Sequence, residues 1–473
     1  MLFNSFIFIP FIFCVFGMAL VAGRRGRVFA LIAFSYVFYS VPYPPWIVLL
    51  VLCTVGDFHL SRWIDRSKAS GARRFAVMVS CALNLGLLAA YKYAGFLAMS
   101  FNDIAQGLGG APLLPVYQPE LPLGISFFVF ESLSYTIDVY RRRLKPADSL
   151  VDYALFICFF PHLIAGPIVR GRDFLPQIQK HLPFQRSATI AGVELVAFGI
   201  FKKAVIADNL APHVDQAFLD PGSLSGAGAW IAVIFFAIQI YCDFSGYTDI
   251  ARGLARILGF ELGRNFNWPY LAQSIADFWR RWHISLSTWL RDYLYIPLGG
   301  NRHGVPQMLW ALLVTWFLGG LWHGAAWHFA IWGLYHGLIV GLGGLVYARF
   351  GNRLWDPLPS SARIAFTFVL VVVGWVLFRA NSIPAALTFF DLMFQPWSGR
   401  FLPQSLSDLA ASVGVIAALA TAHYLSWRAY RGDEDGSMLL ALPYAARAAT
   451  LALTLLAVVL FAGKSQTFIY FQF

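Results

Sequence analysis

Long apolar runs with few charges recur along the whole sequence, and they set the strongest limit on how this chain can fold. Several runs approach the ~20 residues that an α-helix needs to cross a bilayer. Of the 473 residues, 59% are hydrophobic and 12% are charged, whereas an ordinary soluble domain has about 25% charged residues. The sequence therefore predicts an all-α, polytopic membrane protein with a single membrane domain over residues 1–473.

The distribution of Lys and Arg predicts which loops lie on which side of the membrane. Neither residue occurs in 93–140, 204–251 or 303–348. Because positively charged loops stay in the cytoplasm, residues 100–120 and 207–226 are expected outside and the basic loops inside. The net charge of +11 is explained by these loops, so we expect membrane lipid around the chain and no nucleic-acid partner.

About 10–12 transmembrane helices are expected from the lengths of the apolar runs. The first run is interpreted as a membrane helix rather than a cleaved leader, because its arginines follow the apolar stretch. The predicted spans are 2–22, 28–42, 44–56, 75–99, 121–140, 187–206, 228–248, 306–321, 329–348, 364–379, 409–427 and 448–462.

Residues 150–169 do not fit a simple span, because this apolar segment contains Pro161, His162, Gly166 and Pro167. Broken helices survive at membrane depth only where protein or water covers the freed backbone groups. We expect a re-entrant segment here, and interfacial helices elsewhere.

The segment 277–302 differs from the rest of the chain in its charge. Seven arginines, no lysine and only three acids lie between 252 and 302. Arginine suits bidentate contact with phosphate, so Arg280, Arg281 and Arg291 are candidates for binding a phosphate-bearing ligand. The alternative is an interfacial helix that anchors its Trp and Arg side chains among lipid headgroups.

A second segment, 319–337, contains His323, His328 and His336 without a single charged residue. Ionisable groups inside a membrane are costly and tend to be functional. The run 306–321 is only ~24 Å long as a helix, so His323 is expected within the membrane. At ~100° per residue the three histidines do not share a helix face, and no HExxH motif occurs. We therefore expect no metal, and we interpret the neutral imidazole of His323 as a candidate general base.

The chain also resembles a known family at these residues. Trp282-His283-Ile284-Ser285 followed by Trp322-His323-Gly324 is similar to the membrane-bound O-acyltransferases (MBOAT), and in particular to the bacterial branch that O-acetylates alginate and related exopolysaccharides. Further similar stretches are 121–126, 134–140, 160–167, 241–246, 374–379 and 468–473.

The resemblance implies the MBOAT fold, an inner-membrane location and an acetyltransferase activity. It implies His323 as the catalytic residue and His283 as its polar partner. It also implies acetyl-CoA as the donor substrate, no permanently bound cofactor, and a periplasmic hydrolase-like partner that completes transfer to sugar. With that donor, Arg280, Arg281 and Arg291 are expected to hold the diphosphate. The alternatives are D-alanyl transfer to teichoic acid and a transporter without chemistry.

The aromatic stretch 468–473 raises one more hypothesis. The sequence Phe-Ile-Tyr-Phe-Gln-Phe could anchor the chain at the membrane interface. It also resembles the C-terminal tyrosine motif of the small partner peptide in the D-alanylation system. A phenol has a pKa near 10 and is a better leaving group than an alcohol. Tyr470 is therefore a candidate transient acyl carrier, loaded by the His323 site.

Overall fold

The computed structural model describes residues 3, 5, 7–180, 185–395, 443–463 and 466–469, and these residues contain helices and no β-strand. They form two compact units. The first unit comprises 1–193 with 251–263, and the second comprises 194–250 with 264–473. The units interleave along the chain, and the prediction of a single membrane domain over 1–473 stays a prediction.

Two helices run through both units: α10 (Arg186–Ile200) and α12 (Gly226–Ile257). The other helices of the first unit are α1 (Phe8–Val21), α2 (Arg24–Ser40), α3 (Trp46–Arg66), α4 (Ser70–Leu88), the π-helix η1 (Ala89–Tyr93), α5 (Ala94–Gly107), α6 (Ile125–Tyr140), α7 (Leu150–Cys158), α8 (Phe160–Leu163) and α9 (Gly171–Gln179).

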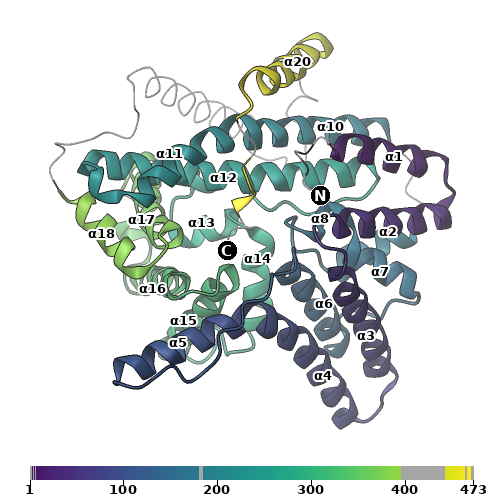
Figure 1. Cartoon of the computed structure of the whole chain (residues 1–473), viewed down its shortest axis with the longest axis horizontal. Helices are drawn as coiled ribbons and strands as arrows, with labels where there is room; N and C mark the ends of the chain where they lie inside the picture. The colour runs from purple at the N-terminus through teal and green to yellow at the C-terminus, as the bar shows by residue number, and fades with distance from the viewer. Residues whose placement is uncertain are drawn as a thin grey trace. The chain divides into compact units, whose positions relative to one another are not determined.

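Within the described residues, the second unit contains five π- or 3₁₀-helical turns beside its α-helices, and Figure 1 labels the α-helices. The first three of these turns along the chain are the π-helix η2 (Phe201–Ala207) and the 3₁₀-helices η3 (Pro221–Ser223) and η4 (Pro269–Leu271). The rest of this unit comprises α11 (Asp208–Leu219), α13 (Ile275–Arg281), α14 (Ile284–Leu290), the π-helix η5 (Arg291–Tyr295), α15 (Val305–His323), α16 (Trp327–Phe350), the 3₁₀-helix η6 (Gly351–Leu354), α17 (Ser360–Arg379), α18 (Ile383–Met393) and α20 (Tyr444–Phe461).

Seven helices in the described residues are long and apolar enough to cross a membrane. They are α3, the continuous helix Ser70–Gly107, α12, α15, α16, α17 and α20. The other predicted spans coincide with shorter or more polar helices, and the predicted span 409–427 lies outside the described residues. A polytopic helical membrane protein is confirmed, while the full number of spans stays a prediction.

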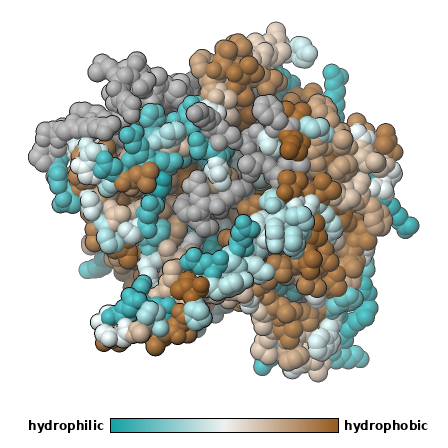
Figure 2. Space-filling view, viewed as in Figure 1, coloured by the Kyte–Doolittle hydropathy of each residue, from teal (hydrophilic) through white to brown (hydrophobic). Residues whose placement is uncertain are grey.

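The helices of the first unit present apolar side chains outward, as lipid-facing helices do. Phe13, Leu52 and Met78 are among the large hydrophobic residues exposed on α1, α3 and α4. Figure 2 shows hydrophobic side chains gathered over this part of the surface. Inside, Asp57 of α3 accepts hydrogen bonds from Ser80, Asn84 and Ser132 of α4 and α6. These bonds satisfy the buried carboxylate and tie the three helices together.

The predicted break within 150–169 is present. Helix α7 ends at Cys158, Phe159 has an extended ψ of 107°, and the short helix α8 follows. The freed N–H of Phe160 donates to Ser35 Oγ over 3.0 Å. Protein therefore covers the broken backbone, which is the condition under which such a segment survives at membrane depth.

Glycines bring α15 and α16 into close contact in the second unit. A Cβ on Gly320 would lie 2.1 Å from the Phe329 carbonyl oxygen, and one on Gly333 would lie 2.0 Å from that of Trp316. No side chain fits at either position, and such small residues let membrane helices approach closely. This contact fixes the end of α15, where His323 lies.

Candidate active site

His323 is the last residue of α15 and is buried among aromatic rings. Its imidazole centroid lies 5.0 Å from the ring of Trp332, 5.1 Å from that of Trp322 and 5.3 Å from that of Phe378. Only 5% of the residue is exposed. Apolar walls of this kind exclude water, and electrostatic interactions are stronger where water is excluded.

His283 lies in a strained turn between α13 and α14, outside the candidate membrane spans. Its φ of 43° is in the left-handed region, which few non-glycine residues adopt. Two backbone hydrogen bonds to the preceding loop hold the turn: Ile284 N–H donates to the Asn265 carbonyl over 3.0 Å, and Asn267 N–H donates to that of Arg281 over 2.8 Å. The loop therefore determines where the imidazole of His283 points.

Asn265 also determines the tautomer of His283. The side-chain oxygen of Asn265 accepts from the backbone N–H of Ser285 over 3.1 Å and from its hydroxyl over 2.9 Å. An amide oxygen must therefore face His283, whose Nδ1 lies 3.3 Å away and donates. The lone pair is then on Nε2. Burial lowers the pKa of His283 to about 3, so this imidazole is neutral at physiological pH.

The structure brings the two predicted histidines together. Their ring centroids are 6.3 Å apart and their planes are inclined by 64°. If both rings form a hydrogen bond of about 2.8 Å to the same oxygen atom, their bonded nitrogens are separated by up to about 5.6 Å. This separation is comparable with the distance between the two ring centroids. Both imidazoles can thus reach a single reacting group.

The other two histidines of the 319–337 segment have structural partners. His328 Nδ1 donates to the Leu377 carbonyl over 3.1 Å. His336 Nδ1 accepts from the indole N–H of Trp279 over 3.3 Å. In the described part of the chain, no group of three or more His, Cys, Asp or Glu side chains is arranged to hold a metal ion.

The three predicted arginines lie on either side of His283 along the chain, and their partners differ. Arg281 Nε forms an ion pair with Asp277 Oδ1 at 3.0 Å, and Arg291 pairs with its neighbour Asp292 at 2.8 Å. The side chain of Arg280 is 72% exposed, and its distance to Asp277 is 3.8 Å. Arg280 is therefore the most available of the three for a ligand.

Tyr470 lies outside the described residues, but the two residues before it are buried in the second unit. The Phe468 ring lies 4.7 Å from Tyr247 and 6.0 Å from Phe244. Phe244 in turn meets the His283 imidazole edge-on at 4.7 Å. One aromatic ring thus separates Phe468 from His283.

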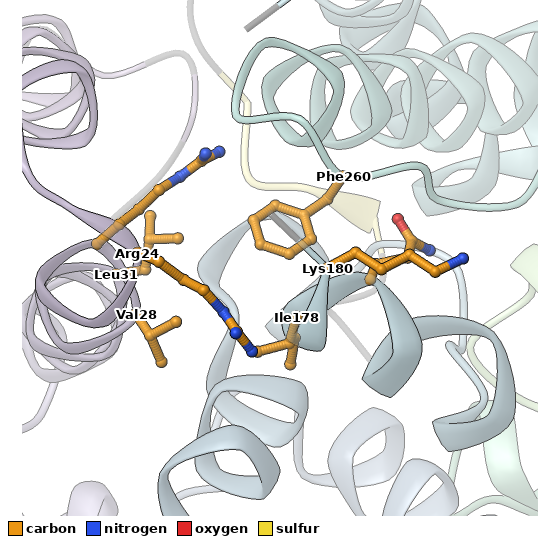
Figure 3. Close-up of a pocket in the computed structure, with 8 residues that line it drawn as sticks. Arg24, Val28, Leu31, Ile178, Lys180 and Phe260 are labelled. Atoms are coloured by element: carbon orange, nitrogen blue, oxygen red, sulfur yellow. The ribbon is translucent and has the colours of Figure 1, made fainter. Parts of the chain in front are cut away.

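A pocket within the first unit contains none of the predicted site residues (Figure 3). It is lined by Arg24, Arg27, Val28, Leu31, Gln177, Ile178, Lys180 and Phe260. Its cationic rim contrasts with the uncharged aromatic surroundings of His323.

Comparison with known proteins identifies the class to which this chain belongs. The model of the MBOAT, membrane-bound O-acyltransferase family, matches residues 121–383, a range that includes both histidines. The chain belongs to this family and is a membrane-bound O-acyltransferase.

Several individual relatives cover most of the chain. It is 39% identical over 433 residues to the probable alginate O-acetylase AlgI of Pseudomonas aeruginosa, covering 90% of this chain and 81% of that protein. It is 36% identical over 380 residues to the peptidoglycan O-acetyltransferase of Helicobacter pylori, covering 75% and 70%. The teichoic acid D-alanyltransferase of Bacillus subtilis is 30% identical over 295 residues, covering 57% and 73%.

Proposed function

We propose that this protein transfers acetyl from cytoplasmic acetyl-CoA across the bacterial inner membrane, for O-acetylation of an exopolysaccharide of the alginate type. The observation that carries the proposal is that the rings of His323 and His283 lie close together among aromatic side chains. His283 is neutral there, and its hydrogen bond to Asn265 fixes its tautomer. The chain is 39% identical to a probable alginate O-acetylase over 90% of its length, which supports acetyl as the transferred group and a polysaccharide as the final acceptor. Membership of an acyltransferase family favours catalysis over the transporter alternative.

His323 acts as the general base in this proposal. Its imidazole takes the proton of an acceptor hydroxyl, whose oxygen attacks the thioester carbonyl. The C–S bond then breaks, and the imidazolium returns the proton to the leaving thiolate. General-base catalysis of this kind contributes about 10²–10⁴-fold.

His283 orients the donor. Because its Nδ1–H is used by Asn265, its Nε2 accepts a hydrogen bond and does not stabilise an oxyanion. An amide N–H of the donor's pantetheine arm is a suitable partner. Arg280, Arg281 and Arg291 bind the diphosphate, and the exposure of the Arg280 side chain supports this role.

Tyr470 carries the acetyl group to a periplasmic hydrolase-like partner. The burial of Phe468 and Ile469, and the contact of the Phe468 ring with Phe244, support this role. The phenol attacks the acetyl thioester, releases the thiol, and holds the acetyl as an ester until the partner moves it to sugar.

The test uses purified protein in vesicles with labelled acetyl-CoA and no partner. Intact-protein mass spectrometry should show one added acetyl on the peptide that contains Tyr470, and none in Tyr470→Phe or His323→Ala. Loading by a D-alanyl carrier protein instead of acetyl-CoA would favour the teichoic acid reaction. Normal polymer acetylation by Tyr470→Phe would remove the carrier step.

A further inference from the structure

A buried ion network in the second unit surrounds the segment 466–469. Lys203 Nζ, in the π-helix η2, lies 2.6 Å from Asp208 Oδ1 and 2.8 Å from Asp243 Oδ1. All three residues are buried. Lys203 thus contacts one oxygen of each carboxyl group, and the second oxygen of each needs another hydrogen-bond donor.

Backbone N–H groups of the 466–469 segment donate to both carboxyl groups. Ile469 N–H donates to Asp243 Oδ2 over 2.7 Å, and the backbone of Gln466 donates to Asp208. The carbonyl of Gln466 accepts from Lys203 Nζ over 3.1 Å. These contacts all involve the main chain of the segment, so the network fixes the position of its backbone. The hydrogen bonds of the network are complete only when the segment is present.

Further contacts hold the segment and the chain just before it. Upstream, Gly463 N–H donates to the Ala204 carbonyl over 3.0 Å, and Asn209 Nδ2 donates to that of Phe461 over 2.9 Å. Within the segment, the Phe468 ring packs against Tyr247. The segment is thus bound by η2, the start of α11 and α12.

We infer that Lys203, Asp208 and Asp243 are a docking site for the 466–469 segment and act as positioning residues for acyl transfer to Tyr470. The second half of this inference rests on the proposed carrier role of Tyr470. None of the three touches the reacting atoms. Their effect passes through the backbone bonds to Gln466 and Ile469, and through Phe468, whose neighbour Phe244 contacts His283.

A matched control pair lies beside the network. Lys202 Nζ forms an ion pair with Asp249 and a 3.0 Å hydrogen bond with Ser245 Oγ. Lys202 directly precedes Lys203, and both pairs join η2 to α12. Within the described residues, Lys202 and Asp249 make no recorded contact with 466–469.

Docking is tested without reference to activity. A single cysteine in place of the buried Ile469, in a background lacking the five native cysteines, reports access to a permeant maleimide. The neutral triple variant Lys203→Met/Asp208→Leu/Asp243→Leu leaves no buried charge unpaired and removes every side-chain donor and acceptor that holds the segment. It should label at least about tenfold faster than the parent, because those buried polar contacts are lost. The neutral control Lys202→Met/Asp249→Leu should label at the parent rate.

A second variant keeps the inference testable if the triple variant fails to fold. Gln466→Pro removes one backbone N–H and leaves every membrane charge in place, so it should also increase labelling. Parent-rate labelling in Gln466→Pro, and in the triple variant where it folds, would overturn the docking site.

Positioning is tested by comparing two acceptors. The neutral triple variant should lose at least about tenfold of acetylation at Tyr470, while transfer from acetyl-CoA to added N-acetyl-tyrosine amide through His323 stays close to the parent rate. A purely structural role would lower both together and would overturn the positioning role, as would faster labelling at 469 with normal acetylation of Tyr470. No acetylation of Tyr470 in the parent, with docking intact, would instead remove the proposed carrier and leave the docking site standing.

Discussion

Two buried histidines, one in each unit, are held by opposite kinds of partner. In the first unit His162 Nδ1 lies 3.0 Å from Glu131 Oε1, which also accepts from Val169 N–H over 2.9 Å. In the second unit His283 Nδ1 donates to the neutral amide of Asn265. A carboxylate favours the imidazolium, whereas an amide fixes the tautomer without adding charge. Burial and a hydrogen bond alone therefore do not identify a catalytic histidine.

The chemistry of the partner explains the difference. The Glu131–His162 contact joins α6 to the broken segment after α7 and holds these two elements together. The Asn265–His283 contact adds no charge and leaves Nε2 as an acceptor, as the proposed role of His283 in orienting the donor requires. Four predictions test this distinction, from the largest expected effect to the smallest.

His323→Ala should lower acetyl transfer by about 10²–10⁴-fold, because it removes the proposed general base. The yield and melting temperature of the protein in detergent should stay close to those of the parent. His328→Asn is the matched control, since an asparagine amide can still donate toward the Leu377 carbonyl. Parent-like transfer by His323→Ala would remove this residue from the reaction.

His162→Leu should have the opposite effect, which is a loss of stability without a loss of activity. The variant leaves the buried Glu131 carboxyl without its imidazole partner, and a buried polar group left unsatisfied costs about 1–3 kcal/mol of stability. The melting temperature should fall, while acetyl transfer per folded molecule stays close to the parent value. A stable His162→Leu protein without activity would place His162 in the reaction and break the comparison.

Asn265→Asp should make the His283 site resemble the Glu131–His162 pair. Burial lowers the pKa of His283 to about 3 in the parent, so its neutral form persists as pH falls. A carboxylate at 265 raises that pKa, and the neutral fraction then decreases about tenfold for each pH unit below it. The ratio of variant to parent kcat/KM should therefore fall as pH is lowered. A ratio independent of pH would show that the tautomer, and not the charge, is what matters.

Arg280→Gln/Arg281→Gln should raise KM for acetyl-CoA about fivefold or more, a loss of about 1 kcal/mol or more that is typical of a charge-assisted contact. The change in kcat should be smaller, because the contact is remote from the carbonyl. Arg302→Gln, another arginine of the same basic segment, is the control. A defect confined to kcat would favour the interfacial anchor.

Much of the fold follows from the sequence because a membrane helix is specified by local composition. The apolar runs predict α12, α15, α16 and α17, and the prolines and glycines of 150–169 predict the break after α7. The full span count does not follow, because α1 and α6 have only 14 and 16 residues. Length alone does not decide whether such helices cross a bilayer.

The candidate site also contains residues that the sequence predicted and residues that it did not. His283 and His323 stand out because their motifs are local, and the structure brings them together. Asn265 has no such signal: it lies 18 residues before His283 in a loop with several polar residues, and its role depends on the turn at 283. Lys203, Asp208 and Asp243 were equally hidden, since only packing reveals which membrane charges meet.

The docked segment also has a consequence for the order in which this protein assembles. Gln466 and Lys203 are separated by 263 residues along the chain, and Ile469 and Asp243 by 226. Lys203 and Asp243 therefore leave the ribosome and enter the bilayer long before the backbone groups that complete their network have been synthesised. During that interval Asp208 and Asp243 lack the backbone donors that the segment supplies. The network is thus completed only once residues 466–469 have been made, and a chain that stops before residue 466 should keep these two carboxyl groups without those donors.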